Sequence, residues 1–160
     1  MAITLREDPT SVNDLSPRYE IGGLYEYFHP DYGRVLLRYY QFLDAVTYAA
    51  GDVCEHASAN CTAVSQDKAA GSSIGRVVAG VALASMTANY FGFVQVAGVG
   101  MVILRTDGTV AKGEYVVSHT VDDEADTMAD GEEEQVFGMS LADDGADNLL
   151  AGQWILKGLI

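Results

Sequence analysis

Short apolar runs separated by Gly-rich or charged turns recur along the chain from residue 34 onward. They are rich in Val, Tyr and Phe, which favour extended structure. The predicted strands are 34–43, 52–56, 76–84, 91–96, 101–105, 114–118, 135–141 and 152–156, with a loop or short strand at 61–64. A turn is predicted at 106–109, "TDGT", and helix fits the pattern only near 87–90 or 124–128. The predicted fold is therefore all-β: a compact β-barrel or β-sandwich of short antiparallel strands.

The longest uncharged stretch, Val77–Leu104, has 28 residues and is long enough to be considered as a membrane span. Its most polar part, Ser85–Asn89, would then lie near the bilayer midplane, and no second apolar segment exists to partner it. Valines and interspersed glycines instead favour buried strands joined by turns. We therefore predict no membrane association.

Two segments of the chain repeat the same pattern. "VAGVALA" at 78–84 recurs as "VFGMSLA" at 136–142, sharing Val-x-Gly-(apolar)-x-Leu-Ala. Upstream of each copy, a Gly followed by an acid opens another strand, in "AGDV" at 50–53 and "KGEYV" at 112–116. The order of a Gly-acid strand and then a Val-x-Gly strand thus occurs twice, which indicates an internal repeat. The alternative is that both pairs are ordinary beginnings of strands.

Residues 1–32 differ from the rest of the chain, because they hold all three prolines and show weak periodicity. They nevertheless carry bulky side chains on a flexible backbone, which suits a segment ordered by a partner surface. The sequence predicts an extended N-terminal arm at 1–32 and a β-domain at 33–160. The alternative is an arm packed on its own domain. The candidate partner-binding residues are Tyr19, Ile21, Leu24, Tyr25, Tyr27 and Phe28.

The net charge of −14 changes the functional picture, because only nine Lys and Arg residues stand against 23 Asp and Glu. Binding to nucleic acid needs clustered basic residues and is therefore not expected. The acids concentrate in residues 81–160, which hold thirteen acids and three bases. The N-terminal sequence has charges at positions 6–8 and no apolar core, so we expect no secretory signal and synthesis in a cytoplasm.

Candidate chemistry is sparse, and no nucleophile, phosphate-loop or zinc-protease motif is present. The run at 122–134 has eight carboxylates and is interpreted as a solvated loop, with adventitious cation binding as the alternative. Cys54 and Cys61 are separated by six residues, among them His56. Free thiols are favoured, although a disulfide or a metal site stays open. We expect no enzymatic activity, cofactor or metal.

Three segments together resemble a known family: "YYQFLDAVTYAAGDV", "SIGRVVAGVALASMTANYFGFVQVAGVGMV" and "DTMADGEEEQVFGMSLADD". They are similar to the capsid decoration, or cement, proteins of tailed bacteriophages. The shared pattern is a Gly-Asp-Val strand, Val-x-Gly-Val-Ala-Leu, an aromatic-Gly-aromatic-Val-Gln segment and a second Val-x-Gly strand. The resemblance covers roughly Tyr39 to Trp154, and its motifs are moderately specific. The acidic run and the aromatic N-terminal segment are not part of it.

The resemblance implies a β-protein without catalysis, made in the host bacterium. Such a protein binds the major capsid protein on the outer surface of the virion, often as a homotrimer, and clamps neighbouring subunits. Contacts of this kind gain strength from multivalency. The alternatives are a tail- or fibre-associated virion component, and a small cytoplasmic β-barrel that binds a ligand.

Overall fold

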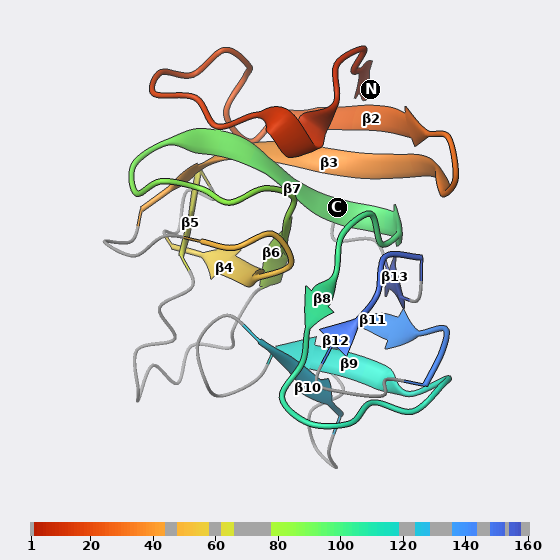
Figure 1. The fold of residues 1–160 in the computed structure, drawn as a ribbon. Helices are drawn as coiled ribbons and strands as arrows, with labels where there is room; N and C mark the ends of the chain where they lie inside the picture. The colour runs from red at the N-terminus through yellow and green to blue at the C-terminus, as the bar shows by residue number, and fades with distance from the viewer. Residues whose placement is uncertain are drawn as a thin grey trace.

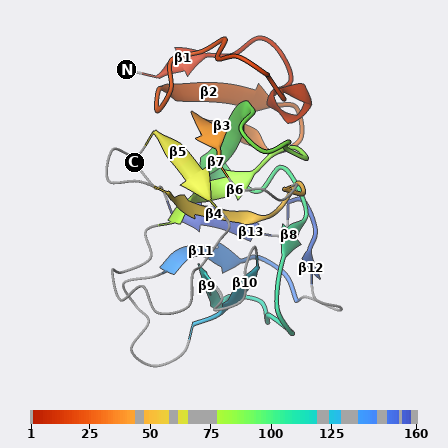
Figure 2. The ribbon, with the colours of Figure 1, turned by 90° about the vertical axis from the view of Figure 1, so that its left-hand side faces the viewer.

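The computed structural model describes residues 2–43, 48–57, 62–65, 78–118, 124–128, 136–143, 148–152 and 154–157. The described residues form a nearly all-β protein, as predicted, whose only helix is the 3₁₀ turn η1, Pro9–Ser11. The strands are β1 Ile3–Thr4, β2 Leu24–His29, β3 Gly33–Phe42, β4 Val53–His56, β5 Ala63–Ser65, β6 Val78–Ala82, β7 Phe91–Val99, β8 Leu104–Arg105, β9 Tyr115–Ser118, β10 Ala125–Thr127, β11 Val136–Ser140, β12 Asn148–Leu149 and β13 Trp154–Lys157. Figures 1 and 2 show three levels: β1 and β2, then β3 to β7, then β8 to β13.

The middle level is a closed barrel of five strands, which we call the first barrel. Its strands neighbour one another in the order β3-β5-β4-β6-β7, and antiparallel pairing of β7 with β3 closes the ring. Alternate side chains of these strands point inward and are buried. This core consists of Tyr40, Phe42, Tyr48, Cys54, Val64, Ala79, Ala82, Met86, Val94 and Val96.

We call the lower level the second unit. Its strands neighbour one another in the same order as the equivalent strands of the first barrel. The order is β10-β9-β11-β13, and Thr106 next to β8 bridges to Ala125 of β10 in parallel, as β3 pairs with β5. The short strand β12 pairs with β8 and takes the place that the start of β7 has beside β3. β13 also pairs with the end of β7, which joins the two units into one sheet.

The internal repeat predicted from the sequence is present in the hydrogen-bond register. In the first barrel Val53 lies opposite Val81 and Cys54 opposite Gly80, after which β6 has one extra residue, Ala79. The second unit repeats this register and the extra residue in β11. Its partners are Tyr115 opposite Met139, Val116 opposite Gly138 and Val117 opposite Val136, with Phe137 as the extra residue. The turns before β4 and β9 agree as well, since in each a carboxylate accepts a backbone N–H three residues upstream, at 2.6 Å from Asp52 and 2.7 Å from Glu114.

Equivalent core positions of the two units carry different volumes. The first barrel has large side chains around β3, namely Tyr40, Phe42 and Tyr48, where the second unit has Leu104, Thr106 and Val110. On the opposite wall the second unit has the larger side chains, because Phe137, Trp154 and Leu156 stand where the first barrel has Ala79, Val94 and Val96. All of these side chains are buried. The large side chains that fill the core therefore come from one wall in the first barrel and from the opposite wall in the second unit, and both cores reach the close packing of protein interiors.

The N-terminal layer, residues 3–29, lies on the first barrel. β2 pairs with β3 over six residues, from Leu24 opposite Arg38 to His29 opposite Gly33, and β1 runs parallel to β2. Asp14 exchanges two backbone hydrogen bonds with Phe91, of 2.9 and 2.8 Å. The prediction that the strands begin after Gly33 is wrong, because β2 at 24–29 is already a strand of the sheet and is joined to β3 by the turn at 30–32.

Other predicted elements differ from the structure in smaller ways. Residues 87–90 form a turn with Asn89 at φ 65°, and residues 125–127 form strand β10, so neither segment is helical. β10 lies inside the acidic run at 122–134, which is therefore not a loop throughout; residues 122–123 and 129–134 of that run are outside the described residues. The uncharged stretch supplies β6, β7 and the start of β8, and among the described residues no helix has the length and apolar character needed to cross a membrane.

Candidate partner-binding surface

The six candidate residues divide between the interior and the surface of the N-terminal layer. Tyr25 and Tyr27 point from β2 toward the apolar cluster between the layer and the barrel, and Tyr25 is only 2% exposed. Tyr19 packs against the same cluster. Leu24 is half-buried, whereas Ile21 and Phe28 are exposed. The structure thus brings the tyrosines together and separates them from the side chains that a partner could reach.

An aromatic cluster holds the layer on the barrel. The ring of Tyr19 lies 5.1 Å from both Tyr39 and Phe93, measured between centroids, and 5.5 Å from Tyr25. Tyr25 also contacts Phe93 edge-to-face at 5.4 Å. Such pairs stabilise beyond the area they bury, by about 0.5–1.5 kcal/mol. The aromatic signal in residues 19–28 is therefore largely a signal of intramolecular packing.

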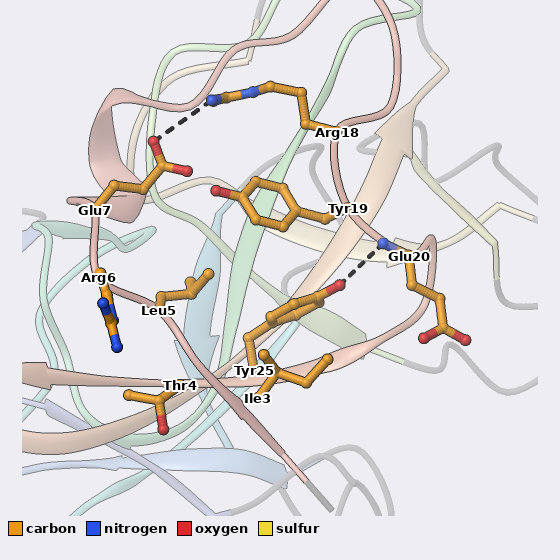
Figure 3. Close-up of a pocket in the computed structure, with 9 residues that line it drawn as sticks. All are labelled: Ile3, Thr4, Leu5, Arg6, Glu7, Arg18, Tyr19, Glu20 and Tyr25. Carbon is orange, nitrogen blue, oxygen red and sulfur yellow. Dashed lines mark hydrogen bonds and ion pairs between the residues drawn. The ribbon is translucent and has the colours of Figure 1, made fainter.

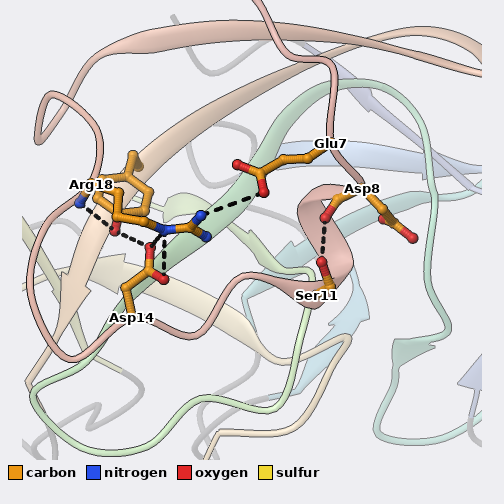
Figure 4. A network of polar contacts seen from close by, with 6 residues as sticks. Glu7, Asp8, Ser11, Asp14 and Arg18 are labelled. Atoms are coloured by element: carbon orange, nitrogen blue, oxygen red, sulfur yellow. Dashed lines mark hydrogen bonds and ion pairs between the residues drawn. The ribbon is translucent and has the colours of Figure 1, made fainter.

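A polar network next to this cluster fixes the segment before β2 (Figure 4). Arg18 Nε donates to both carboxylate oxygens of Asp14, at 2.8 and 2.9 Å, and Arg18 also pairs with Glu7 at 3.5 Å. The buried Tyr39 hydroxyl donates to Asp14 Oδ2 at 2.8 Å. The hydrogen bond to Asp14 raises the pKa of Arg18, and burial, followed by the hydrogen bond to Asp14, raises the pKa of Tyr39. The layer is therefore built as part of the folded protein.

An open groove of about 480 Å³ lies between the start of the layer and the segment that precedes β2 (Figure 3). It is lined by residues 3–7 on one side, residues 18–20 on the other, and Tyr25 at its base. Glu20 N–H donates to the Tyr25 hydroxyl at 2.9 Å, so this polar atom is already satisfied. The groove thus presents apolar walls from Ile3, Leu5 and Tyr19.

Strand β1 is an edge strand of the sheet, because it follows β2 at the end of the described strand order. Leu5 N–H donates to Glu26 O at 2.8 Å. Successive residues of a strand direct their backbone groups to opposite sides, so the N–H of Thr4 faces away from β2. Ile3, beside it, is 56% exposed, and Phe28 on β2 is 57% exposed. An exposed backbone edge flanked by large apolar side chains is a site where an extended peptide can add as a further strand.

The outer face of this edge is held by a small polar network. Thr4 Oγ1 and Arg34 Nε donate to the two carboxylate oxygens of Glu26, at 2.8 and 2.9 Å. The hydrogen bond from Arg34, and then the one from Thr4, lower the pKa of Glu26. The network links β1, β2 and β3 on the face that carries Phe28. Sequence reasoning did not select Ile3 or Thr4, although the apolar–polar alternation of Ile3, Thr4 and Leu5 is a weak strand signal.

Other candidate chemistry receives no support from the described residues. Cys54 lies buried in the first barrel with its Sγ 3.7 Å from the carbonyl of Asp52, whereas Cys61 and His119 fall outside the described residues. Within the described part of the chain, no three His, Cys, Asp or Glu side chains come together in a way that could hold a metal ion.

His56, at the end of β4, gives the folded protein a specific pH dependence. Its Nδ1 is buried and has no hydrogen-bond partner among the described residues, and its ring lies 5.6 Å from that of Tyr40. Burial, followed by the positive charge of Arg38, lowers the imidazole pKa. The unfolded chain, with an imidazole pKa of about 6.5, therefore binds the proton more readily than the folded chain. His56 lowers stability as the pH falls from about 6.5 toward its folded pKa, and has little effect above about pH 7.

We therefore expect His56→Gln to lose less stability than the wild type between pH 7.5 and pH 5.5. The measurement is the free energy of unfolding from urea titrations at both pH values. Equal losses in the two proteins would show that His56 is not the group that titrates.

Comparisons with protein-family models, with curated proteins and with solved structures give no match to this chain.

Proposed function

We propose that the protein is a structural component of a tailed-bacteriophage virion that decorates the outer surface of the capsid and stabilises it. The observation that carries the proposal is the edge of β1, where exposed Ile3 and Phe28 flank backbone groups that face away from the sheet. The resemblance of residues 39–154 to decoration proteins supplies the biological setting. The proposed partner is the major capsid protein, and the protein is made in the cytoplasm of the host bacterium.

The geometry suggests how the capsid protein would be held. An extended segment of the capsid protein adds to the β1 edge, which supplies main-chain hydrogen bonds. Its side chains contact Ile3 in the groove on one face and Phe28 on the other. The polar networks around Asp14 and Glu26 hold the edge in place before binding, which lowers the entropy lost on association. Several weak contacts of this kind on one particle become strong together.

We expect Thr4→Pro to weaken binding to capsids far more than Thr4→Val. Proline removes the N–H that faces away from β2 and leaves the Leu5–Glu26 hydrogen bond in place, and edge strands tolerate proline. Valine keeps that N–H and, like proline, loses the hydroxyl that contacts Glu26. The measurement is occupancy of purified undecorated capsids after co-sedimentation at matched protein concentration. Equal occupancy for the two variants would exclude strand addition at this edge.

The apolar contacts are tested with Ile3→Ser and Phe28→Ser. Each is expected to lower affinity for capsids by about 30-fold, because a central apolar anchor commonly contributes about 2 kcal/mol. Leu150→Ser is the control, since Leu150 is 52% exposed and directly follows β12 of the second unit. Binding of the wild type to isolated tails and not to capsids would replace capsid decoration by the tail- or fibre-associated alternative.

A further inference from the structure

The charged side chains that line the groove beside β1 are unequally paired. Arg18 is held by Asp14 and Glu7, and the Arg18–Glu7 ion pair joins the two walls at one end of the groove (Figure 3). The Glu20 carboxylate is exposed, has no ion pair or hydrogen bond with any described residue, and points away from Arg18 in the same view. Arg6 lies on the other side of that view. The end of the groove beside Glu20 therefore carries an uncompensated negative charge.

Glu20 is fixed next to the apolar floor of the groove. Its backbone N–H donates to the Tyr25 hydroxyl at 2.9 Å, and its carbonyl oxygen accepts the N–H of Gly23 at 3.0 Å. Tyr25 lies opposite Ile3 in the pairing of β1 with β2, and Ile3 is 56% exposed. An apolar surface thus runs from the exposed edge of β1 to a single carboxylate.

We propose that this groove receives a long basic side chain, arginine or lysine, from the partner segment that adds to β1. The inference rests on the proposed strand addition and names the residue that the added strand carries. Side chains of the added strand that point toward the groove lie beside Ile3 and Leu5, because neighbouring strands align their side chains on the same face. Residues 3–7 form the near wall and residues 18–20 the far wall, so only a long side chain reaches Glu20.

Arginine and lysine match both parts of this surface. Their methylene stems pack on apolar side chains while the charged head stays in water. Here the stem contacts Ile3, Leu5 and Tyr19, and the head donates charge-assisted hydrogen bonds to the Glu20 carboxylate. An apolar side chain would leave this carboxylate unpaired, and an acidic one would be repelled by it. The net charge of −14 also attracts a basic segment.

The side-chain preference is tested with synthetic peptides and the full-length protein. Three peptides alternate valine and threonine and differ only at the central position, which is arginine, norleucine or glutamate. Norleucine keeps an apolar stem and lacks the charge. We expect the arginine peptide to bind about 5-fold more tightly than the norleucine peptide, as for a favourable exposed ion pair, and the glutamate peptide to bind most weakly. NMR titration of the isotope-labelled protein gives the dissociation constants, and signals of residues 3–7 and 18–20 locate the site.

Glu20→Gln should abolish the preference, so that the arginine and norleucine peptides bind with similar affinity. The substitution changes an exposed side chain and keeps the backbone hydrogen bonds to Tyr25 and Gly23, so the fold is retained. Asp31→Asn is the matched control, because it removes the same charge from an exposed carboxylate that follows the other end of β2. It should keep the preference of about 5-fold.

Absence of binding by all three peptides, or equal binding of the arginine and norleucine peptides to the wild type, would overturn the inference. A preference that persists in Glu20→Gln, one lost equally in Asp31→Asn, or binding that leaves the signals of the groove unchanged would do the same. None of these outcomes bears on the capsid occupancy of Thr4→Pro and Thr4→Val. An arginine preference without any binding to capsids would contradict capsid decoration and leave the inference standing.

Discussion

Gly51→Ala is expected to destabilise the protein more than the surface substitutions Ile3→Ser or Phe28→Ser, and to prevent folding at physiological temperature if the fold is marginally stable. Gly51 has φ +98°, and a Cβ added to it would overlap the carbonyl oxygen of Ile103 in the segment that connects the two units. The backbone there cannot move easily, because Gly51 N–H donates to Ala82 O at 2.8 Å. Strain from the left-handed backbone, about 1–2 kcal/mol, adds to a steric penalty of about 1–3 kcal/mol.

The internal repeat supplies a control for this prediction. Gly113 is the equivalent residue of the second unit, with φ +87° and the same hydrogen bond to the paired strand, at 3.0 Å from Ser140 O. A Cβ at Gly113 would meet no atom within 4 Å. Gly113→Ala should therefore show the backbone strain alone. The measurement is the free energy of unfolding of both variants, and equal losses would mean that contact with Ile103 contributes nothing.

Arg105→Met is expected to cost about 2 kcal/mol of stability, because it removes a cation that pairs with a buried carboxylate, and the 37% exposure of the Arg105 side chain reduces the penalty of a fully buried pair. Asp52 is 1% exposed, and its Oδ1 lies 3.2 Å from Arg105 Nη1. Arg105 belongs to β8 and also pairs with Glu124 beside β10, at 3.2 Å. The guanidinium thus joins a carboxylate of the first barrel to one of the second unit. Urea unfolding of the single variant gives the measurement.

The combination Asp52→Asn with Arg105→Met separates loss of the charge pair from loss of packing. Without the buried carboxylate no uncompensated charge is left, and the amide oxygen can still accept the N–H of Ala49, now 2.6 Å from Asp52 Oδ2. We expect the double variant to be more stable than Arg105→Met. Arg34→Met provides the comparison for an exposed ion pair, with Glu26, and should change stability by at most about 1 kcal/mol. A double variant no more stable than Arg105→Met would assign the effect to packing.

Much of the sheet was predictable because its strands combine apolar runs with glycine turns. The repeated Val-x-Gly motif identified β6 and β11. These strands pair with β4 and β9, respectively, in equivalent registers. β10 was missed because its sequence, Ala-Asp-Thr, carries no apolar alternation and lies within an acidic run. β12 has only two residues and depends on pairing with β8. Short strands of this kind are fixed by tertiary pairing rather than by local sequence.

The surface was less predictable than the fold. The aromatic residues of the N-terminal segment were selected because such side chains dominate interfaces, but the same property makes them good intramolecular anchors. Sequence alone could not tell that Tyr25 faces Phe93 whereas Phe28 faces outward, because both lie in a run without clear alternation, "LYEYFH". The edge position of β1 depends on its parallel pairing with β2, residues 24–29, which no local pattern encodes.

Strand β7 makes the two units a single cooperative structure. Its first part pairs with β3 and β6 within the first barrel, and its last residues, 97–99, pair with β13 of the second unit. Most repeat proteins stack units that each keep their own strands, so their stability divides into separate terms. Here one strand belongs to both units. Loss of β7 from either unit exposes apolar surface in both, and a fragment that contained only one half of the duplication would lack part of its own sheet.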